Sequence, residues 1–192
     1  KLNNSEGIAT SLTSIGLAYQ SLKKYEDALS YHNEALEIYK KLNIPQHIAT
    51  SLNNIGGVHE DMSEHEKALK YYEDSLRIRK MLNIPADIAI SLTNIASVYF
   101  ALGNYDKALQ YYEEALKINR KLDIKKRIVA DLNKIGHIYN ILGYVDKAMK
   151  YHMEALQIVD KINKQSGFKD LKSIATTFNN MAHVSMSRGH YA

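Results

Sequence analysis

Cysteine is absent from the 192-residue chain, which excludes disulfide frameworks, thiolate nucleophiles and cysteine-ligated zinc or iron–sulfur centres. Proline is almost as scarce. The two prolines are Pro45 and Pro85, so long helices can form over most of the sequence. No apolar run approaches the roughly 20 residues that a membrane-spanning helix needs, and no signal-peptide pattern opens the sequence. We therefore expect no membrane partner and a cytoplasmic location.

Charge and motif content argue against nucleic-acid binding and against catalysis. The net charge is +4, but lysine and arginine are interleaved with aspartate and glutamate instead of being concentrated on one stretch. No phosphate-binding loop, nucleophile elbow or metal-ligand spacing occurs. The histidines fall mostly where other repeats carry tyrosine or polar residues, which predicts aromatic substitutes and not metal ligands. We therefore expect no enzyme activity, cofactor, metal or small-molecule substrate within these residues.

A repeat with a period of 40 residues dominates the sequence. Displacing the sequence by this period aligns apolar, small and aromatic residues through four full units. The aligned sets include Ile15, Ile55, Ile95 and Ile135; Leu12, Leu52, Leu92 and Leu132; Ala28, Ala68, Ala108 and Ala148; and Tyr31, Tyr71, Tyr111 and Tyr151.

Each unit contains two apolar stripes with helical spacing, separated by residues that end helices. In the third unit one stripe runs over 88–102 and the next over 108–122. Gly103 between them can end a helix in the left-handed conformation, and Asn83-Ile84-Pro85 is typical of a helix stop followed by a start. The pattern predicts an all-α chain of helical hairpins. Small residues at Gly16, Gly56, Ala96 and Gly136 and at the aligned alanines would let the two helices of a hairpin approach closely.

The run Leu102–Leu116, LGNYDKALQYYEEAL, closely resembles the tetratricopeptide repeat (TPR). The 40-residue period is similar to the long-helix variant of kinesin light chains, spindle-orientation adaptors and bacterial signalling proteins. The resemblance implies a right-handed superhelix (α-solenoid) of antiparallel helix-turn-helix hairpins. Three departures from the pattern, His59, Ser63 and Val145, predict weaker hairpin turns in some units.

The spacing predicts a single array over residues 1–192 that is a fragment of a longer protein. Residues 1–3 match the end of a second helix, and 174–184 match the first helix of a further unit. There, Phe178, Met181 and Val184 would form an exposed apolar edge that favours self-association. The predicted repeats are 5–44, 45–84, 85–124, 125–164 and a partial fifth at 168–192.

The resemblance also implies that the first helix of each hairpin lines a concave groove. Recurring asparagines there could donate to and accept from the backbone of an extended peptide. Alternatively, they are solvated or bond to the neighbouring repeat. The candidate groove residues are Asn53, Asn54, Glu60, Thr93, Asn94, Phe100, Asn133, Lys134, His137, Asn140, Asn179 and Asn180.

The sequence therefore predicts a protein-interaction scaffold that binds a peptide or helix of a partner protein, or of its own parent chain. Glu60 in the second unit and Lys134 in the fourth favour a ligand with a basic segment towards one end. A self-assembly or spacer module, and a sensor-regulatory region of a larger signalling enzyme, remain alternative interpretations.

Overall fold

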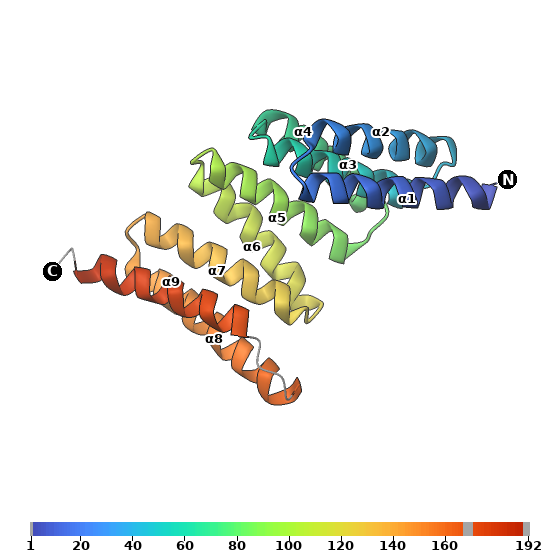
Figure 1. Ribbon diagram of the computed structural model, residues 1–192. Coiled ribbons are helices and arrows are strands. Elements are labelled where there is room, and N and C mark those ends of the chain that lie inside the picture. Colours follow the sequence, from blue (N-terminus) through green and yellow to red (C-terminus); the bar gives the residue numbers. More distant parts are fainter. Residues whose placement is uncertain (1, 167–170, 190–192) are drawn as a thin grey trace. The chain divides into compact units, whose positions relative to one another are not determined.

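The computed structural model describes residues 2–166 and 171–189, and their regular structure is entirely helical (Figure 1). The all-α class expected from the repeat is confirmed. Among the described helices, none combines the length and the apolar character that crossing a bilayer requires. The helices are α1 (Leu2–Ser21), α2 (Tyr25–Lys41), α3 (Pro45–Asp61), α4 (His65–Met81), α5 (Pro85–Ala101), α6 (Tyr105–Lys121), α7 (Lys125–Ile141), α8 (Val145–Ser166) and α9 (Leu171–Gly189).

The helix ends follow the predicted stop and start residues. Asn83 adopts a φ of 51° after α4, and Pro85 is the first residue of α5. Gly103 ends the next helix with a φ of 72°. Ser63 takes the same left-handed conformation, with a φ of 60°, although it carries a side chain. The turn with serine is therefore closed like the others but at a cost in backbone strain.

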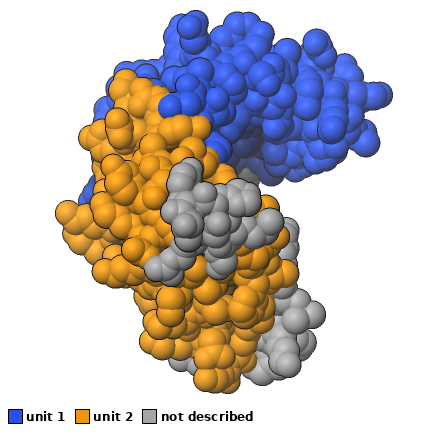
Figure 2. Space-filling model, turned by 90° about the vertical axis from the view of Figure 1, so that its left-hand side faces the viewer, with its two compact units in different colours: residues 1–103 blue, residues 104–192 orange. Residues whose placement is uncertain are grey.

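The chain forms two compact units, residues 1–103 and 104–192, which are coloured separately in Figure 2. The boundary falls in the turn between α5 and α6. In the first unit α1 pairs with α2 and α3 with α4, while α2 packs on α3 and α4 on α5. In the second unit α7 pairs with α8, and α6 packs on α7 and α8 on α9. Successive helical hairpins thus stack within each unit.

Glycines on the first helix of a hairpin let an aromatic ring of the second helix lie against the backbone. A Cβ added to Gly56 would lie 2.8 Å from Cδ1 of Tyr72. A Cβ at Gly16 would lie 2.6 Å from Cε1 of His32, in the preceding hairpin. Gly136 meets His152 in the same way. The sequence predicted that these glycines let two backbones approach, but the space beside each glycine is filled by a buried ring of the second helix.

We expect Gly56→Ala to lower the free energy of unfolding by about 1–3 kcal/mol, because the new methyl would overlap the ring of Tyr72. Gly7→Ala is the matched control, since Gly7 lies exposed in α1 with nothing within 4 Å of its added Cβ. That substitution should raise stability by about 0.5–1 kcal/mol through helix propensity. Both variants gain helix propensity, so the difference between their urea unfolding curves measures the cost of the overlap between the new methyl and the Tyr72 ring. Equal stabilisation by the two substitutions would show that Gly56 does not lie against the ring of Tyr72.

The expected apolar edge on α9 is only partly present. Phe178 is 54% exposed and Met181 is half-buried, but Val184 is fully buried. The prediction for Val184 was wrong because it considered only the helix that would follow α9. In the structure α9 packs against both α7 and α8, the helices that precede it.

Candidate functional site

The candidate site lies on two surfaces that we call the first-helix faces. In the first unit this face is formed by α1, α3 and α5, and α3 contacts both of the others. In the second unit it is formed by α7 and α9, which also contact each other. The predicted groove residues are Asn53, Asn54 and Glu60 on α3; Thr93, Asn94 and Phe100 on α5; Asn133, Lys134, His137 and Asn140 on α7; and Asn179 and Asn180 on α9.

Two of the recurring asparagines in the first unit bond to each other across neighbouring repeats. Nδ2 of Asn94 donates to Oδ1 of Asn53 over 3.0 Å, which joins α5 to α3. Nη1 of Arg79 approaches the same oxygen at 3.4 Å. Both asparagines are half-buried. This pair follows the alternative interpretation of the asparagines, in which they hold adjacent repeats together.

Acidic side chains at the end of α3 are also engaged. The hydroxyl of Tyr72 donates to Oε2 of Glu60 over 2.6 Å, and Nε2 of Gln20 on α1 donates to Oδ2 of Asp61 over 2.7 Å. Burial raises the pKa of Tyr72, and the carboxylate of Glu60 raises it further, so the phenol remains a donor. The Gln20–Asp61 bond is a second link between first helices. Thr93 and Phe100 lie half-buried on α5.

Asn133 belongs to a buried network in the second unit. Asn133 is 8% exposed, and its Oδ1 lies 2.9 Å from Nδ1 of His152. Its Nδ2 donates over 3.1 Å to Oγ1 of Thr177 on α9, and that hydroxyl donates to the backbone oxygen of Ser173. The amide of Asn133 therefore connects α7 to both α8 and α9. In this arrangement it does not face solvent.

The other predicted residues of the second unit are more accessible. Lys134 is exposed, with Nζ 5.4 Å from the centre of the Tyr112 ring. His137 is also exposed, and its pKa is lowered by partial burial and by the neighbouring His183 and Lys134. Oδ1 of Asn140 is buried and accepts no hydrogen bond in the described part of the chain.

Three predicted amides remain available for a ligand. Asn54 and Asn180 are half-buried and Asn179 is exposed. None of the three makes a side-chain hydrogen bond to the described residues. Asn54 and Asn180 occupy the same position in the repeat, so the two first-helix faces each present an equivalent amide.

Two buried polar groups that the sequence did not single out bond to the following first helix. Arg79 is 5% exposed, and its Nη1 donates to Oγ of Ser91 over 2.8 Å. Forty residues later, Nδ2 of Asn119 donates to Oδ2 of Asp131 over 2.7 Å, with both residues buried. The varied residues at this repeat position, which include Tyr39 and Val159, conceal the shared role. The sequence did carry one indication of this bond: Asp131, which is also polar, stands at the repeat position of Ser91.

The described side chains offer no cluster of three or more histidine, aspartate or glutamate residues able to hold a metal ion.

Several solved structures share the fold of this chain. BtubC (BKLC) from P. vanneervenii has a TM-score of 0.85 and 23% identity, over 96% of this chain and 74% of its own. A putative kinesin light chain of P. anserina with nearly identical TPR-like repeats has a TM-score of 0.77 and 16% identity, over 97% and 88%. A Rap protein complexed with Competence and Sporulation Factor has a TM-score of 0.78 and 20% identity, over 95% and 52%. This chain therefore spans about half of that Rap protein.

The sequence comparisons identify the repeat itself. A search of curated proteins finds no significant match. The family model of the tetratricopeptide repeat matches two segments, 7–81 and 87–161, which together cover most of the 192 residues. The predicted resemblance is confirmed: the chain belongs to the tetratricopeptide repeat family.

Proposed function

We propose that the chain is a protein-interaction scaffold whose first-helix faces bind an extended peptide segment of a partner protein or of its own parent chain. The observation that carries this proposal is the set of unengaged amides at Asn54, Asn179 and Asn180. A side-chain amide has two donors and an acceptor, which match the N–H and C=O groups of an extended backbone.

The bonds between first helices support the same proposal. The Asn53–Asn94 bond fixes α3 against α5, and the Gln20–Asp61 bond fixes α1 against α3. A surface that is already ordered loses less conformational entropy when it binds a ligand. The Rap protein of similar fold was solved in complex with Competence and Sporulation Factor, which supports ligand binding as a role for a chain of this fold.

We expect Asn54→Ala to weaken peptide binding about two- to tenfold, the effect of losing one net hydrogen bond of 0.5–1.5 kcal/mol. The probe is a peptide selected from a random display library on the immobilised chain, and the measurement is isothermal titration calorimetry. Asn54 makes no hydrogen bond to the described residues, so the substitution should leave thermal stability unchanged. Asn94→Ala should instead lower both affinity and stability, because it removes the bond to Asn53.

Asn33→Ala is the matched control. Asn33 lies exposed on the second helix α2, away from the first-helix face, and its amide bonds to the backbone of Leu29. Its replacement should leave the affinity unchanged. If Asn54→Ala and Asn33→Ala both bind like the unmodified chain, the selected peptide does not use the first-helix face and the proposal fails.

Self-assembly is the second candidate function, favoured by an apolar pocket in the second unit. The pocket has a volume of about 420 Å³, lies between α8 and α9, and is lined in part by Leu156, Ile174 and the exposed Phe178. Light scattering separates the two functions: a mass that rises with protein concentration and returns to that of a monomer in Phe178→Asp favours assembly through this pocket.

A further inference from the structure

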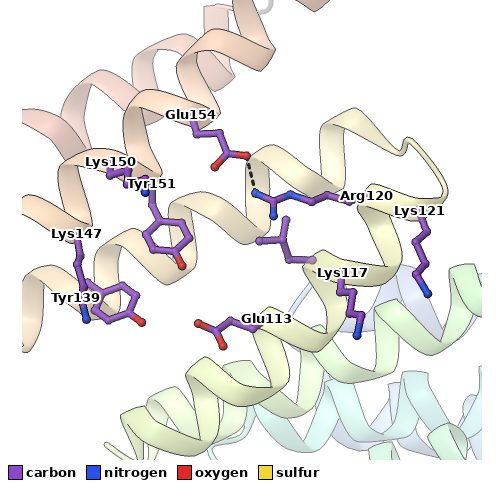
Figure 3. A pocket seen from close by; sticks show the side chains of 10 residues that line it. Glu113, Lys117, Arg120, Lys121, Tyr139, Lys147, Lys150, Tyr151 and Glu154 are labelled. Carbon is purple, nitrogen blue, oxygen red and sulfur yellow. Dashed lines mark hydrogen bonds and ion pairs between the residues drawn. The ribbon is translucent and has the colours of Figure 1, made fainter.

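A pocket in the second unit lies between the second helices α6 and α8, with Tyr139 of α7 beside it (Figure 3). Its volume is about 800 Å³. This surface is distinct from the first-helix face of the same unit, which α7 and α9 form. The cationic side chains that line the pocket are Lys117, Arg120, Lys121, Lys147 and Lys150.

The charge around this pocket is unbalanced. Glu113 and Glu154 are its two carboxylates, so the five cations leave a net charge of +3. Arg120 is the one cation paired with a lining carboxylate, since its Nη2 forms an ion pair with Glu154. The exposed Lys117, Lys121 and Lys150 form no ion pair with the described residues. Lys117 does not pair with Glu113, although the two stand four residues apart on α6.

Aromatic rings form part of the pocket wall. Tyr139 and Tyr151 stack with their centroids 5.5 Å apart and their planes 14° from parallel. Nζ of Lys147 lies 5.2 Å from the centre of Tyr139 and 5.0 Å from that of Tyr144. Burial raises the pKa of Tyr139 and of Tyr151, so both phenols stay protonated at neutral pH. Protonated phenols can donate hydrogen bonds to an anion.

We propose that this pocket binds an anionic peptide segment through its carboxylate or phosphate groups. Like charges gathered around one cavity repel one another, and an anionic ligand relieves that repulsion. A volume of about 800 Å³ has room for a short segment of peptide, and the stacked tyrosines provide a flat surface for its apolar atoms. This site would act in addition to the first-helix face and does not depend on it.

The equivalent positions of the first unit, 80 residues earlier, carry a smaller excess of cations. There Lys40, Lys41, Lys67 and Lys70 stand against Glu37 and Asp74, which leaves a net charge of +2. Glu37 stands where the second unit has Lys117, and it pairs with Lys40 over 2.8 Å. Glu64 stands where the second unit has Tyr144, and it pairs with Lys67 over 2.9 Å. In the second unit the matching Lys147 lies over aromatic rings instead and forms no ion pair with the described residues. The larger excess, with Lys117 and Lys147 outside any ion pair to the described residues, is therefore a property of this pocket and not of every repeat.

The test compares two double charge reversals of equal size. Lys121→Glu with Lys150→Glu alters the pocket, and Lys41→Glu with Lys70→Glu alters the equivalent exposed positions of the first unit. The probes are fluorescein-labelled oligoglutamate, a peptide of repeated phosphoserine-glycine, a neutral serine-glycine peptide and a single-stranded DNA of matched charge. Fluorescence anisotropy at low ionic strength reports binding. The pocket variant should bind the preferred anionic peptide about tenfold more weakly, and the control within about twofold of the unmodified chain.

Each outcome bears on the proposal. If the phosphoserine peptide binds more tightly than oligoglutamate, the pocket recognises phosphate groups of its ligand. If oligoglutamate binds more tightly, it recognises carboxylates. Equal weakening by the two double variants shows attraction to net charge alone and overturns the site. The same holds if neither anionic peptide binds or if the DNA binds most tightly. Asn54 lies in the first unit and this pocket in the second, so the two proposed sites can fail independently.

Discussion

Replacing Arg79 with alanine is expected to lower the free energy of unfolding by about 3–5 kcal/mol, because it leaves a cavity and unpaired acceptors. The residue is 5% exposed on α4. Its Nη1 lies 2.8 Å from Oγ of Ser91, 3.1 Å from the backbone oxygen of Asp87 and 3.4 Å from Oδ1 of Asn53. One guanidinium thus joins α4 to the helices before and after it. Urea unfolding followed by circular dichroism measures the loss.

Arg77→Ala is the matched control for this prediction. Arg77 lies two residues earlier on the same helix, its side chain is 70% exposed, and it pairs with Asp74. Exposed ion pairs contribute little, so its loss should cost less than about 0.5 kcal/mol. Arg79→Lys should also be less stable than the unmodified chain, because an ammonium cannot reproduce the planar fork of donors. A similar small cost for Arg77→Ala and Arg79→Ala would show that the buried contacts do not stabilise the stack.

The sequence predicted the helices and turns well because each depends on residues close together in the chain. The left-handed conformations of Gly103 and Asn83 and the position of Pro85 follow from local preferences. The 40-residue period repeats those preferences, so a single hairpin pattern is enough to predict the others. The small residue at Gly56 was recognised, but its partner was not: the sequence pointed to the aligned alanines, and the ring of Tyr72 lies against the glycine instead.

The fate of each first-helix asparagine could not be predicted in the same way. Asn53 and Asn54 are adjacent in the sequence, yet Asn53 bonds to the next repeat and Asn54 makes no bond to the described residues. The spacing of the repeat places both on a polar side of α3. Which of them reaches a neighbouring helix depends on how the hairpins stack. Asn133 was likewise predicted as a groove residue but lies buried between helices.

The sequence did not predict the cationic pocket, for a related reason. Glu113 and Lys117 stand four residues apart, a spacing typical of a solvated, paired helix face. The structure instead leaves Lys117 unpaired among the described residues and brings it to the same pocket as Lys150 on α8. Such a charge excess arises from helices that are adjacent in space, and it cannot be read from either helix alone.

Acid is expected to destabilise the fold through two buried histidines. His32 is fully buried and His152 is 1% exposed, at positions where the second and third repeats carry Tyr72 and Tyr112. Burial lowers the pKa of His32. Burial, with a further contribution from His137, lowers the pKa of His152 from 6.5 to about 4. Below pH 6.5 the unfolded chain takes up protons that the folded chain resists, so protons favour unfolding.

The resulting loss should appear as the pH falls from 6.5 towards 4, with full stability above that range. A shift of this size in His152 corresponds to about 3 kcal/mol. The measurement is urea unfolding at a series of pH values between neutral and pH 4. Alongside it, His47→Gln serves as a control for histidine content, because the His47 side chain is 41% exposed.

His32→Tyr and His152→Tyr should make the fold resistant to acid, because tyrosine fits the same space against a glycine. In the second repeat the hydroxyl of Tyr72 donates to Glu60. The residues at the repeat position of Glu60 are Gln20 for His32→Tyr and Asn140 for His152→Tyr, and both can accept a hydrogen bond. The buried Oδ1 of Asn140 currently lacks a donor among the described residues, so it would gain one from the new hydroxyl.

The two variants should differ at neutral pH. Neither ring nitrogen of His32 has a partner among the described residues, so His32→Tyr should raise stability by about 1 kcal/mol. His152→Tyr gains a bond to Asn140 but loses the one to Asn133, and should be nearly neutral. If the double variant still loses stability between pH 6.5 and 4 as the unmodified chain does, protonation of these histidines is not what unfolds the repeat.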